Sequence, residues 1–516
     1  MSQQPHFVIF ITDQQRADWL GCYGHPVVKT PHIDSIAQQG TRFDNFHVAN
    51  PVCMPNRASL LTGRYPSVHG LRHNGCLLPE RARTFVEQLA EHGYKTAAIG
   101  KSHLQPFTGL KPLYDMPKAG EAWRQDTKDY TLEEPPHYET DDHYDFPTPY
   151  YGYQHVDMVT GHGTQCGGHY AQWLKAQRSD WQQLLDPANQ IPHNYTCPQA
   201  ERTQVPTELY PTSYVAMRAT QYLQENLSSQ QPTFTFISFP DPHHPWNPPG
   251  KYWDMYQPEQ FDVAVHFEDH HNPPQHLRSK RQDYEDGSQI THRQQSFMAK
   301  DQHIKEAMAL TAGMITMIDD AVGNILATIK QSDQADNTVI CFTSDHGDYL
   351  GDFNLLLKGG WLRESICRVP FIWADPTKQQ APHSNTLAGT IDIAATVLAR
   401  AGIEPFNGNQ GISLLPALNQ DLALRQALLI EENDPVPRYG LPTAARVRQV
   451  LKDNWSLTII MGQDEGELYN RQTDPHECHN LWHHPSHQTK KMELLLALTH
   501  LLTAQMDESP KANRYA

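Results

Sequence analysis

Short apolar runs alternate with amphipathic segments along the first 410 residues. The run "HFVIFIT" (6–12) has the length and composition of a buried strand. "TPHIDSIAQQG" (30–40) has a Thr cap, a Pro at the first helical position and a final Gly, which predicts a short helix. The alternation predicts further strands at 94–100, 232–239, 337–344 and 369–375, and further helices at 84–93, within 304–330 and at 389–402. Strands that alternate with helices predict an α/β fold with a large, mostly parallel sheet flanked by helices.

The pattern changes near residue 410. "QALLIEEN" (426–433), "RVRQVLKDNWSLTIIM" (446–461) and a terminal helix within 488–506 fit a smaller α+β domain. We therefore expect a main domain at 1–410 and a second domain at 411–516 that contains an antiparallel sheet. Two long stretches, about 105–210 and 245–300, lack clear periodicity and are rich in Tyr, His, Trp and Pro. Long loops of this kind are usually functional or disordered, and their aromatic content favours a role in a substrate pocket.

Composition excludes several classes of protein. The 516 residues carry a formal net charge of −17, which gives no global attraction to nucleic acid or to an anionic membrane. An anionic substrate would therefore need basic residues gathered locally. No stretch approaches the roughly 18 consecutive apolar residues of a membrane span. No basic segment followed by an apolar one opens the chain, so we expect a cytoplasmic protein, or a periplasmic or secreted one if a leader was removed. Eight cysteines without a dense spacing pattern argue against a disulfide framework.

One cysteine lies in a distinctive context, "NPVCMPNRASLLTGRYPSVHG" (50–70). The run 58–62 favours a helix that ends at Gly63. Cys53 would then lie just before the first turn, where free N–H groups and the helix dipole favour anions and lower the pKa of a thiol. The alternative is a buried structural cysteine.

Polar side chains follow two of the predicted strands. Asp13 and Gln14 come directly after the first strand, and Asp345 and His346 come after the strand at 337–344. The carboxyl ends of parallel strands form the ligand-binding edge of an open α/β sheet. Carboxylate and amide oxygens there suit a hard cation, whereas His346 keeps Mn²⁺ and Zn²⁺ in consideration. Taken alone, each Asp is more typical of a helix cap or a loop.

Basic residues follow other predicted strands. "GKSHL" places Lys101 and His103 on the same side of an extended segment, "PDPHHP" contains His243 and His244, and "LLLKGG" contains Lys358. A lone Lys or His is usually a solvated surface group. The clusters after the predicted strands indicate a function only when they are considered together.

Together these clusters resemble the type I sulfatases of the alkaline phosphatase superfamily, over most of the chain. The sequence Cys53-Met54-Pro55-Asn56-Arg57 followed by "ASLLTGR" is similar to the sulfatase signature, and "GELYNRQTDPHECHNL" (466–481) resembles a late element of the family. The resemblance implies that Cys53 is converted to formylglycine, whose aldehyde hydrates to a gem-diol. It also implies that Pro55 and Arg57 belong to the signal that a maturation enzyme recognises.

The resemblance further implies one divalent cation, favoured as Ca²⁺, with Mn²⁺ or another divalent metal left open. Its ligands would be Asp13, Gln14, Asp345, His346 and the modified residue 53. Many sulfatases have an acid in place of Gln14 and Asn in place of His346. Gln14 and the Asp-His pair also occur in relatives that cleave phosphonate monoesters and phosphodiesters, whereas the Lys-x-His pattern of Lys101 and His103 matches true sulfatases.

The resemblance assigns catalytic roles as well. Residue 53 would be the nucleophile, positive charge would hold the sulfate group, and a histidine would protonate the leaving alcohol. The residues expected in these roles are Cys53, Arg57, Lys101, His103 as base, His243 as acid and Lys358, with Asn74, His244 and Trp246 expected to contact the substrate. Adjacent side chains of an extended segment point in opposite directions, so only one of the two histidines is expected to face the sulfur. The resemblance assigns this place to His243, which stands two residues before Pro245 in the family's "PHxP" pattern.

The sequence therefore predicts a sulfatase that hydrolyses a sulfate monoester, with a sulfated carbohydrate as the favoured substrate. A phosphonate monoester or phosphodiester hydrolase, and a sulfatase for small aryl or choline-type esters, are the alternatives. A catalytically silent carbohydrate-binding relative is disfavoured by the intact CxPxR pattern and both lysines. The expected partners are a sulfated small molecule or saccharide and a formylglycine-generating maturation enzyme. Homo-oligomerisation is left open, and neither nucleic acid nor a membrane span is expected.

Overall fold

The computed structural model describes residues 4–112, 122–123, 128–140, 143–229, 231–359, 361–378, 380–438 and 440–514. Parts of the stretch predicted as irregular at 105–210, namely 113–121, 124–127 and 141–142, lie outside the described residues.

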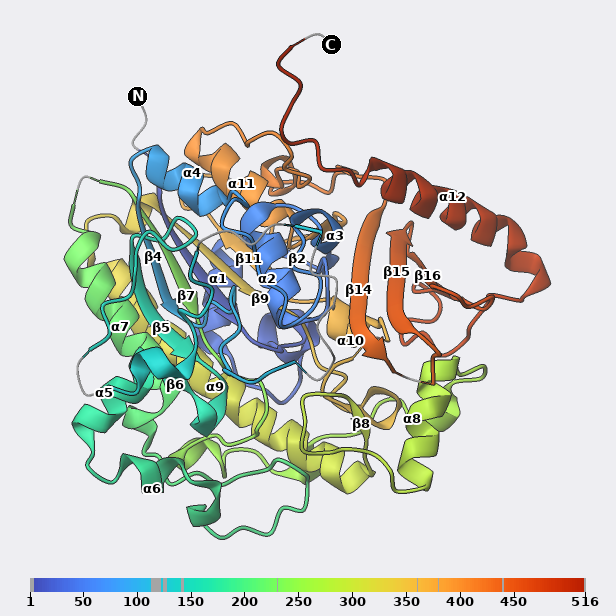
Figure 1. Ribbon diagram of the computed structural model, residues 1–516, viewed down its shortest axis with the longest axis horizontal. Helices are drawn as coiled ribbons and strands as arrows, with labels where there is room; N and C mark the ends of the chain where they lie inside the picture. Colours follow the sequence, from blue (N-terminus) through green and yellow to red (C-terminus); the bar gives the residue numbers. More distant parts are fainter. Residues whose placement is uncertain are drawn as a thin grey trace.

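A nine-stranded sheet forms the centre of the molecule (Figure 1). Its central strand β1 (His6–Thr12) pairs in parallel with β9 (Thr338–Ser344) on one side and β7 (Thr233–Ser238) on the other. The strand order is β12-β2-β11-β9-β1-β7-β4-β5-β6, with β2 at Thr41–Phe43, β4 at Lys95–Gly100, β5 at His155–Thr160, β6 at Gly167–Gly168, β11 at Phe371–Ala374 and β12 at His383–Ser384. The predicted, mostly parallel sheet is confirmed. Two strands depart from it, because β11 runs antiparallel to β9 and β2, and β6 runs antiparallel to β5.

Helices cover both faces of this sheet, as the alternation of side chains along β1 requires. Phe7, Ile9 and Ile11 pack in one cluster with the helices α2, α4 and α11, whereas Val8 and Phe10 pack in another with α1, α7 and α9. The bounds of these helices are Pro31–Gln39 (α1), Cys53–Thr62 (α2), Phe85–Glu91 (α4), Pro211–Asn226 (α7), Asp301–Gln331 (α9) and Asp392–Ala401 (α11). The sequence prediction omitted α7, together with the strand β5 and the helices α5 (His169–Gln177) and α6 (Trp181–Leu185) in the stretch predicted as irregular.

The helix α9 is long and apolar enough to cross a membrane by length and composition, with a mean hydropathy of 1.2 over its best window. Two thirds of that window, 67%, is buried inside the fold, where α9 packs against α7 and α1. A core helix of this kind has the same apolar composition as a membrane span, and its burial accounts for its hydropathy.

A second, antiparallel sheet lies beside the first (Figure 1). Its strands are β14 (Leu428–Pro437), β15 (Ala444–Lys452), β16 (Trp455–Ile460) and β17 (Glu467–Asn470), and the helix α12 (Gln488–Ala504) packs on it through Leu494 and Leu498. The predicted C-terminal antiparallel sheet and terminal helix are confirmed, while the boundary at residue 410 stays a prediction. The remaining strands and α-helices of the described residues, apart from short 3₁₀ helices, are β3 (Phe46–His47), β8 (Phe297–Met298), β10 (Leu355–Leu356), β13 (Ala388–Gly389), α3 (Pro66–His69), α8 (Gln275–Glu285) and α10 (Glu364–Cys367).

Candidate active site

Charged side chains converge at the carboxyl ends of five neighbouring strands. Asp13 follows β1, Asp345 follows β9 and Lys101 follows β4, each by one residue. His162 lies two residues after the end of β5, and His243 lies in the turn that follows β7. These strands are consecutive in the sheet, in the order β9-β1-β7-β4-β5. Residues far apart in the sequence therefore meet at one edge, which is where open α/β sheets bind ligands.

The helix α2 places Cys53 at this edge. Cys53 is the first residue of the helix rather than the residue before it, and all ten residues of α2 are buried. The helix therefore starts one residue earlier than predicted, and Pro55 is accommodated because it stands in the first turn, where a proline removes no intrahelical hydrogen bond. Gly63 ends the helix with a φ of 60°, as predicted.

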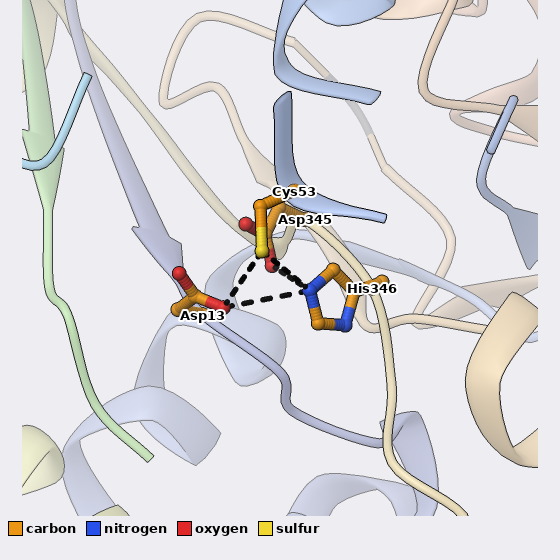
Figure 2. Close-up of side chains that lie close together, drawn as sticks. All are labelled: Asp13, Cys53, Asp345 and His346. Carbon is orange, nitrogen blue, oxygen red and sulfur yellow. Dashed lines mark hydrogen bonds and ion pairs between the residues drawn. The ribbon is translucent and has the colours of Figure 1, made fainter. Parts of the chain in front are cut away.

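Four potential metal-ligating side chains face one another at this point (Figure 2). The ligand atoms of Asp13, Cys53, Asp345 and His346 all lie within 4.8 Å of one another. Cys53 Sγ is 3.1 Å from His346 Nε2 and 3.7 Å from Asp13 Oδ1. Two carboxylates, an imidazole and residue 53 form a donor set that fits one divalent cation.

The side-chain amide of Gln14 is oriented by a neighbouring acid. Its Nε2 donates a hydrogen bond to Asp348 Oδ2 at 2.5 Å, so that Oε1 faces the other way and accepts from Lys358 Nζ at 2.9 Å. Burial raises the pKa of Asp348 to about 6. The predicted metal ligand Gln14 therefore presents an oxygen toward the cluster, in a left-handed backbone conformation with a φ of 65°.

Positive charge surrounds residue 53. Lys358 Nζ lies 3.2 Å from Cys53 Sγ, and Lys101 forms a close ion pair with Asp13. Burial and the charge of Asp13 act to raise the pKa of the Cys53 thiol, but the charges of Lys358, Lys101 and His346 outweigh them and hold that pKa well below its usual range. The site therefore stabilises negative charge at residue 53, as expected for a nucleophile.

Arg57 holds the two sides of the site together. Its Nε donates to Asp345 Oδ2 at 2.7 Å, and its Nη1 donates to the backbone oxygen of Lys101 at 2.7 Å and to Ser238 Oγ at 2.8 Å. Its Nη2 is buried and has no hydrogen-bond partner among the described residues. Arg57 thus fixes the segment that carries Lys101 relative to Asp345.

His103 lies beside residue 53 in a conformation that the sequence did not predict. Its φ is 55°, so the segment "GKSHL" is not extended at this residue, and its backbone N–H donates to the buried Glu133 at 3.0 Å. Burial and the charge of Lys101 lower the pKa of His103 to about 3, against the opposing effect of Cys53. A neutral imidazole at this position can accept a proton, as the predicted base requires.

Both histidines of "PDPHHP" lie at the site, as expected, but their side chains do not point in opposite directions as the sequence predicted. His243 Nε2 lies 2.9 Å from Lys358 Nζ, and His244 Nδ1 lies 3.2 Å from Gln14 Nε2. The two rings stack with centroids 4.0 Å apart. The physical reason is that residues 241–245 form a turn, so the alternation of an extended strand does not apply.

The predicted substrate contacts Asn74 and Trp246 have structural surroundings of their own. Asn74 Oδ1 accepts a hydrogen bond from the backbone N–H of Met54 at 3.2 Å and so holds the first turn of α2. Trp246 is 1% exposed and packs in the hydrophobic cluster of α7 and α9, with its ring centroid 6.2 Å from that of His244. Contact of either residue with a substrate stays a prediction.

Three site residues were absent from the sequence prediction: His162, Glu133 and Asp348. His162 Nε2 lies 2.6 Å from Lys101 Nζ, and its ring stacks on that of His243. Asp348 follows the predicted site residue Asp345 by three positions, but nothing in the sequence links it to Gln14. His162 follows the strand β5, so the recognition of "HVDMVT" as a strand would have placed it at the ligand edge.

Comparison with known proteins identifies relatives of the chain. A family model described as Sulfatase matches residues 5–403, and one described as N-sulphoglucosamine sulphohydrolase, C-terminal, matches residues 351–504. The uncharacterized sulfatase YidJ of Escherichia coli (strain K12) is 26% identical over 495 residues, which cover 93% of this chain and 83% of YidJ. An N-acetylglucosamine-6-O-sulfatase of Bacteroides thetaiotaomicron is 22% identical over an alignment of 572 positions, which covers 99% of this chain and 88% of the relative's chain. The solved phosphonate monoester hydrolase of Agrobacterium radiobacter has a TM-score of 0.76 at 21% identity, over 98% of this chain and 97% of its own.

Proposed function

The chain belongs to the sulfatase family and is a sulfuric ester hydrolase of the alkaline phosphatase superfamily. We propose that it cleaves a sulfated carbohydrate and that formylglycine at residue 53 is the nucleophile. The observation that carries the proposal is the position of Cys53, which lies at the start of α2 between Lys358 and the pair of Lys101 and Asp13.

The surroundings of residue 53 support nucleophilic attack on sulfur. A hydroxyl of the gem-diol attacks sulfur as its proton passes to a carboxylate of the cluster, of which Asp13 Oδ1 lies 3.7 Å from Cys53 Sγ. The bond from sulfur to the ester oxygen breaks, and the sulfate group becomes attached to residue 53. Lys101, Lys358 and Arg57 supply fixed positive charge around a group that carries negative charge on its oxygens. Because these cations are held by buried hydrogen bonds, little reorganisation is needed during the reaction.

The departing alcohol needs a proton, and the pair of His243 and Lys358 holds one. Burial and the neighbouring imidazoles, together with Lys358, hold the pKa of His243 well below its usual range, so its ring is neutral in the free enzyme. Nδ1 donates to the backbone oxygen of His244 at 2.5 Å, which leaves the lone pair of Nε2 facing the Lys358 ammonium at 2.9 Å. A proton shared along this contact can pass to the leaving oxygen.

The second step regenerates the enzyme. The remaining hydroxyl on residue 53 loses its proton to the neutral His103, the bond between carbon and the sulfate oxygen breaks, and sulfate leaves as the aldehyde re-forms. His103 is unprotonated in the free site, and negative charge at residue 53 acts to raise its pKa, so its basicity would increase as the hydroxyl gives up its proton.

Asp13, Gln14, Asp345, His346 and residue 53 would hold a divalent cation, favoured as Ca²⁺, and that ion would supply Lewis-acid stabilisation of the sulfate oxygens. Elemental analysis of the purified protein should find one divalent metal per chain. Asp345→Asn should lower that content, because it removes one of the two carboxylates in the set.

The favoured substrate is a sulfated sugar. The similarity to an N-acetylglucosamine-6-O-sulfatase and the match to the C-terminal model of an N-sulphoglucosamine sulphohydrolase support it. A phosphonate monoester or phosphodiester hydrolase is the alternative, favoured by Gln14 and by the pair of Asp345 and His346. Kinetics on 4-nitrophenyl sulfate, a sugar 6-sulfate and an aryl phosphonate should give the highest kcat/KM on a sulfate ester. A higher kcat/KM on the phosphonate would favour the alternative.

The nucleophile is tested by mass spectrometry of the peptide that contains residue 53, after production beside a competent maturation enzyme. The peptide should be lighter by about 18 Da than the unmodified cysteine peptide. Cys53→Ser, made in the same host, should remain folded and lack turnover. Full turnover by protein that retains the thiol would refute the proposed nucleophile.

A further inference from the structure

We propose that His162 is a positioning residue that sets both the sulfate-binding cation Lys101 and the leaving-group acid His243. This inference rests on the proposed function. His162 is buried at the carboxyl end of β5, with 4% of its surface exposed, and it contacts both residues through different parts of one ring.

The first contact is a hydrogen bond that involves Nε2 of His162. This atom lies 2.6 Å from Lys101 Nζ, and the same ammonium forms a close ion pair with Asp13. An ammonium carries only donors, so Nε2 is the acceptor and the proton of the ring lies on Nδ1. Two of the three N–H bonds of Lys101 are thereby directed by protein groups, which leaves one for the sulfate group.

The second contact is made by the face of the ring. The rings of His162 and His243 are nearly parallel, with an interplanar angle of 12° and centroids 3.5 Å apart. His243 is held at its edge as well, through Nδ1 and the backbone oxygen of His244. The stacked ring of His162 therefore limits rotation of the His243 ring, whose Nε2 must stay directed toward Lys358.

The two contacts have separable consequences. Loss of the acceptor would affect Lys101, which binds the sulfate group in both steps and for any leaving group. Loss of the flat ring would affect His243, and the proton that His243 shares with Lys358 matters only when the leaving alcohol is a poor one. A residue that merely fills space would show neither pattern.

Two variants divide these contacts between them. His162→Phe keeps a flat ring on His243 and removes the acceptor, whereas His162→Gln keeps an amide oxygen that can accept from Lys101 and removes the ring. The kinetics of each variant are measured on 4-nitrophenyl sulfate, whose leaving group needs little protonation, and on a sugar 6-sulfate. His243→Ala is the reference for loss of the acid, and thermal unfolding reports the folded state of each protein.

His162→Phe should lower kcat/KM on both substrates by the same factor, about 10–10²-fold, as for the loss of a directed charged contact. His162→Gln should lower kcat/KM on the sugar sulfate by about 10-fold or more and spare the aryl sulfate, in the manner of His243→Ala. The same pattern in both variants, wild-type kinetics in both, or failure of both to fold would each overturn the proposal. A wild-type enzyme without activity on any sulfate ester would instead refute the proposed function.

Discussion

Two buried cations lie five residues apart on one loop, and their surroundings differ completely. Lys358 is 4% exposed, and its Nζ contacts Gln14 Oε1, Cys53 Sγ and the ring nitrogens of His243 and His346. Arg363 is 2% exposed and forms a close ion pair with Glu467 of β17. It also donates to Tyr469 Oη at 2.9 Å and lies over the Trp361 ring, 3.7 Å from its centroid.

The two cations differ in whether a carboxylate neutralises their charge. No carboxylate in the described ranges lies within ion-pair distance of Lys358 Nζ, whereas Arg363 is neutralised by Glu467 and surrounded by aromatic faces. A buried charge without a counter-ion is costly to the fold and is retained where an anionic ligand will compensate it. A buried charge with its counter-ion in place fixes two segments of the chain together. This contrast supports the proposed role of Lys358 in binding the sulfate group. Arg363 joins the C-terminal sheet to the loop that carries Lys358.

The sharpest test of this contrast is Lys358→Met. Removal of the ammonium should lower kcat/KM on a sulfate ester by about 10³-fold, since a directed positive charge at the reacting group is lost. The free energy of unfolding should stay the same or rise, because an uncompensated buried charge is gone. Steady-state kinetics and urea denaturation check the two expectations. A strongly destabilised variant would show that Lys358 has a structural role after all.

Glu467→Gln should have the opposite effect. It leaves Arg363 with only the more distant Glu477, whose Oε2 lies 3.8 Å from Nη1. The free energy of unfolding should fall by roughly 3–5 kcal/mol, as for other broken buried ion pairs. The kcat of the folded fraction should stay close to that of wild type. The matched control is the double replacement Arg363→Met and Glu467→Leu, which removes both charges and should recover most of the stability. If Glu467→Gln lost as much activity as Lys358→Met, the distinction between a structural Arg363 and a functional Lys358 would be refuted.

The carboxyl group of Glu477, near Arg363, should make the free energy of unfolding depend on pH. Burial raises the pKa of Glu477 to about 7, even though Arg363 acts to lower it. In the unfolded chain this carboxyl titrates near pH 4.3, so the native state holds the extra proton between about pH 4.3 and 7. Stability should therefore fall as pH rises through that window, by up to about 4 kcal/mol, and level off above pH 7. Urea denaturation at pH 5 to 8 should show this fall in wild type and a flatter profile in Glu477→Gln. Parallel profiles would mean that the carboxyl is not responsible.

Asn74→Ala should have the smallest effect. It removes the acceptor for the Met54 N–H in the first turn of α2, and loss of such a capping hydrogen bond lowers stability by about 1 kcal/mol. Thermal unfolding measures that change, and kinetics on a sulfate ester separate the two roles of the residue. An unchanged KM would limit Asn74 to support of the helix, whereas a marked rise in KM would support the predicted contact with the substrate.

The sequence predicted those parts of the site that directly follow a strongly apolar strand. Asp13 after "HFVIFIT" and Asp345 after "NTVICFTS" could be placed at one edge because parallel strands share the direction of their carboxyl ends. Cys53 was found through its spacing to Pro55 and Arg57. In each case a local signal pointed to the residue.

Residues positioned by tertiary structure could not be found in this way. His162 follows β5, whose sequence "HVDMVT" mixes polar and apolar residues although all but its first residue are buried. The orientation of the Gln14 amide depends on Asp348, 334 residues away in the chain. The left-handed backbone of His103 and the turn that brings both His243 and His244 to the site are set by packing, to which periodicity is insensitive.

The pairing of β1 also determines when the central sheet can form during synthesis of the chain. Phe7 lies opposite Phe234 of β7, so the neighbour of the first strand is made only after a further 227 residues, the difference of the two positions. At 5–20 residues per second that delay lasts roughly 10–45 s, during which the apolar strand has no sheet to join. Cys53 is 0% exposed in the finished protein, and His346, which covers it, is synthesised later still. The proposed conversion of Cys53 by another enzyme would therefore have to take place before the sheet forms and buries this side chain.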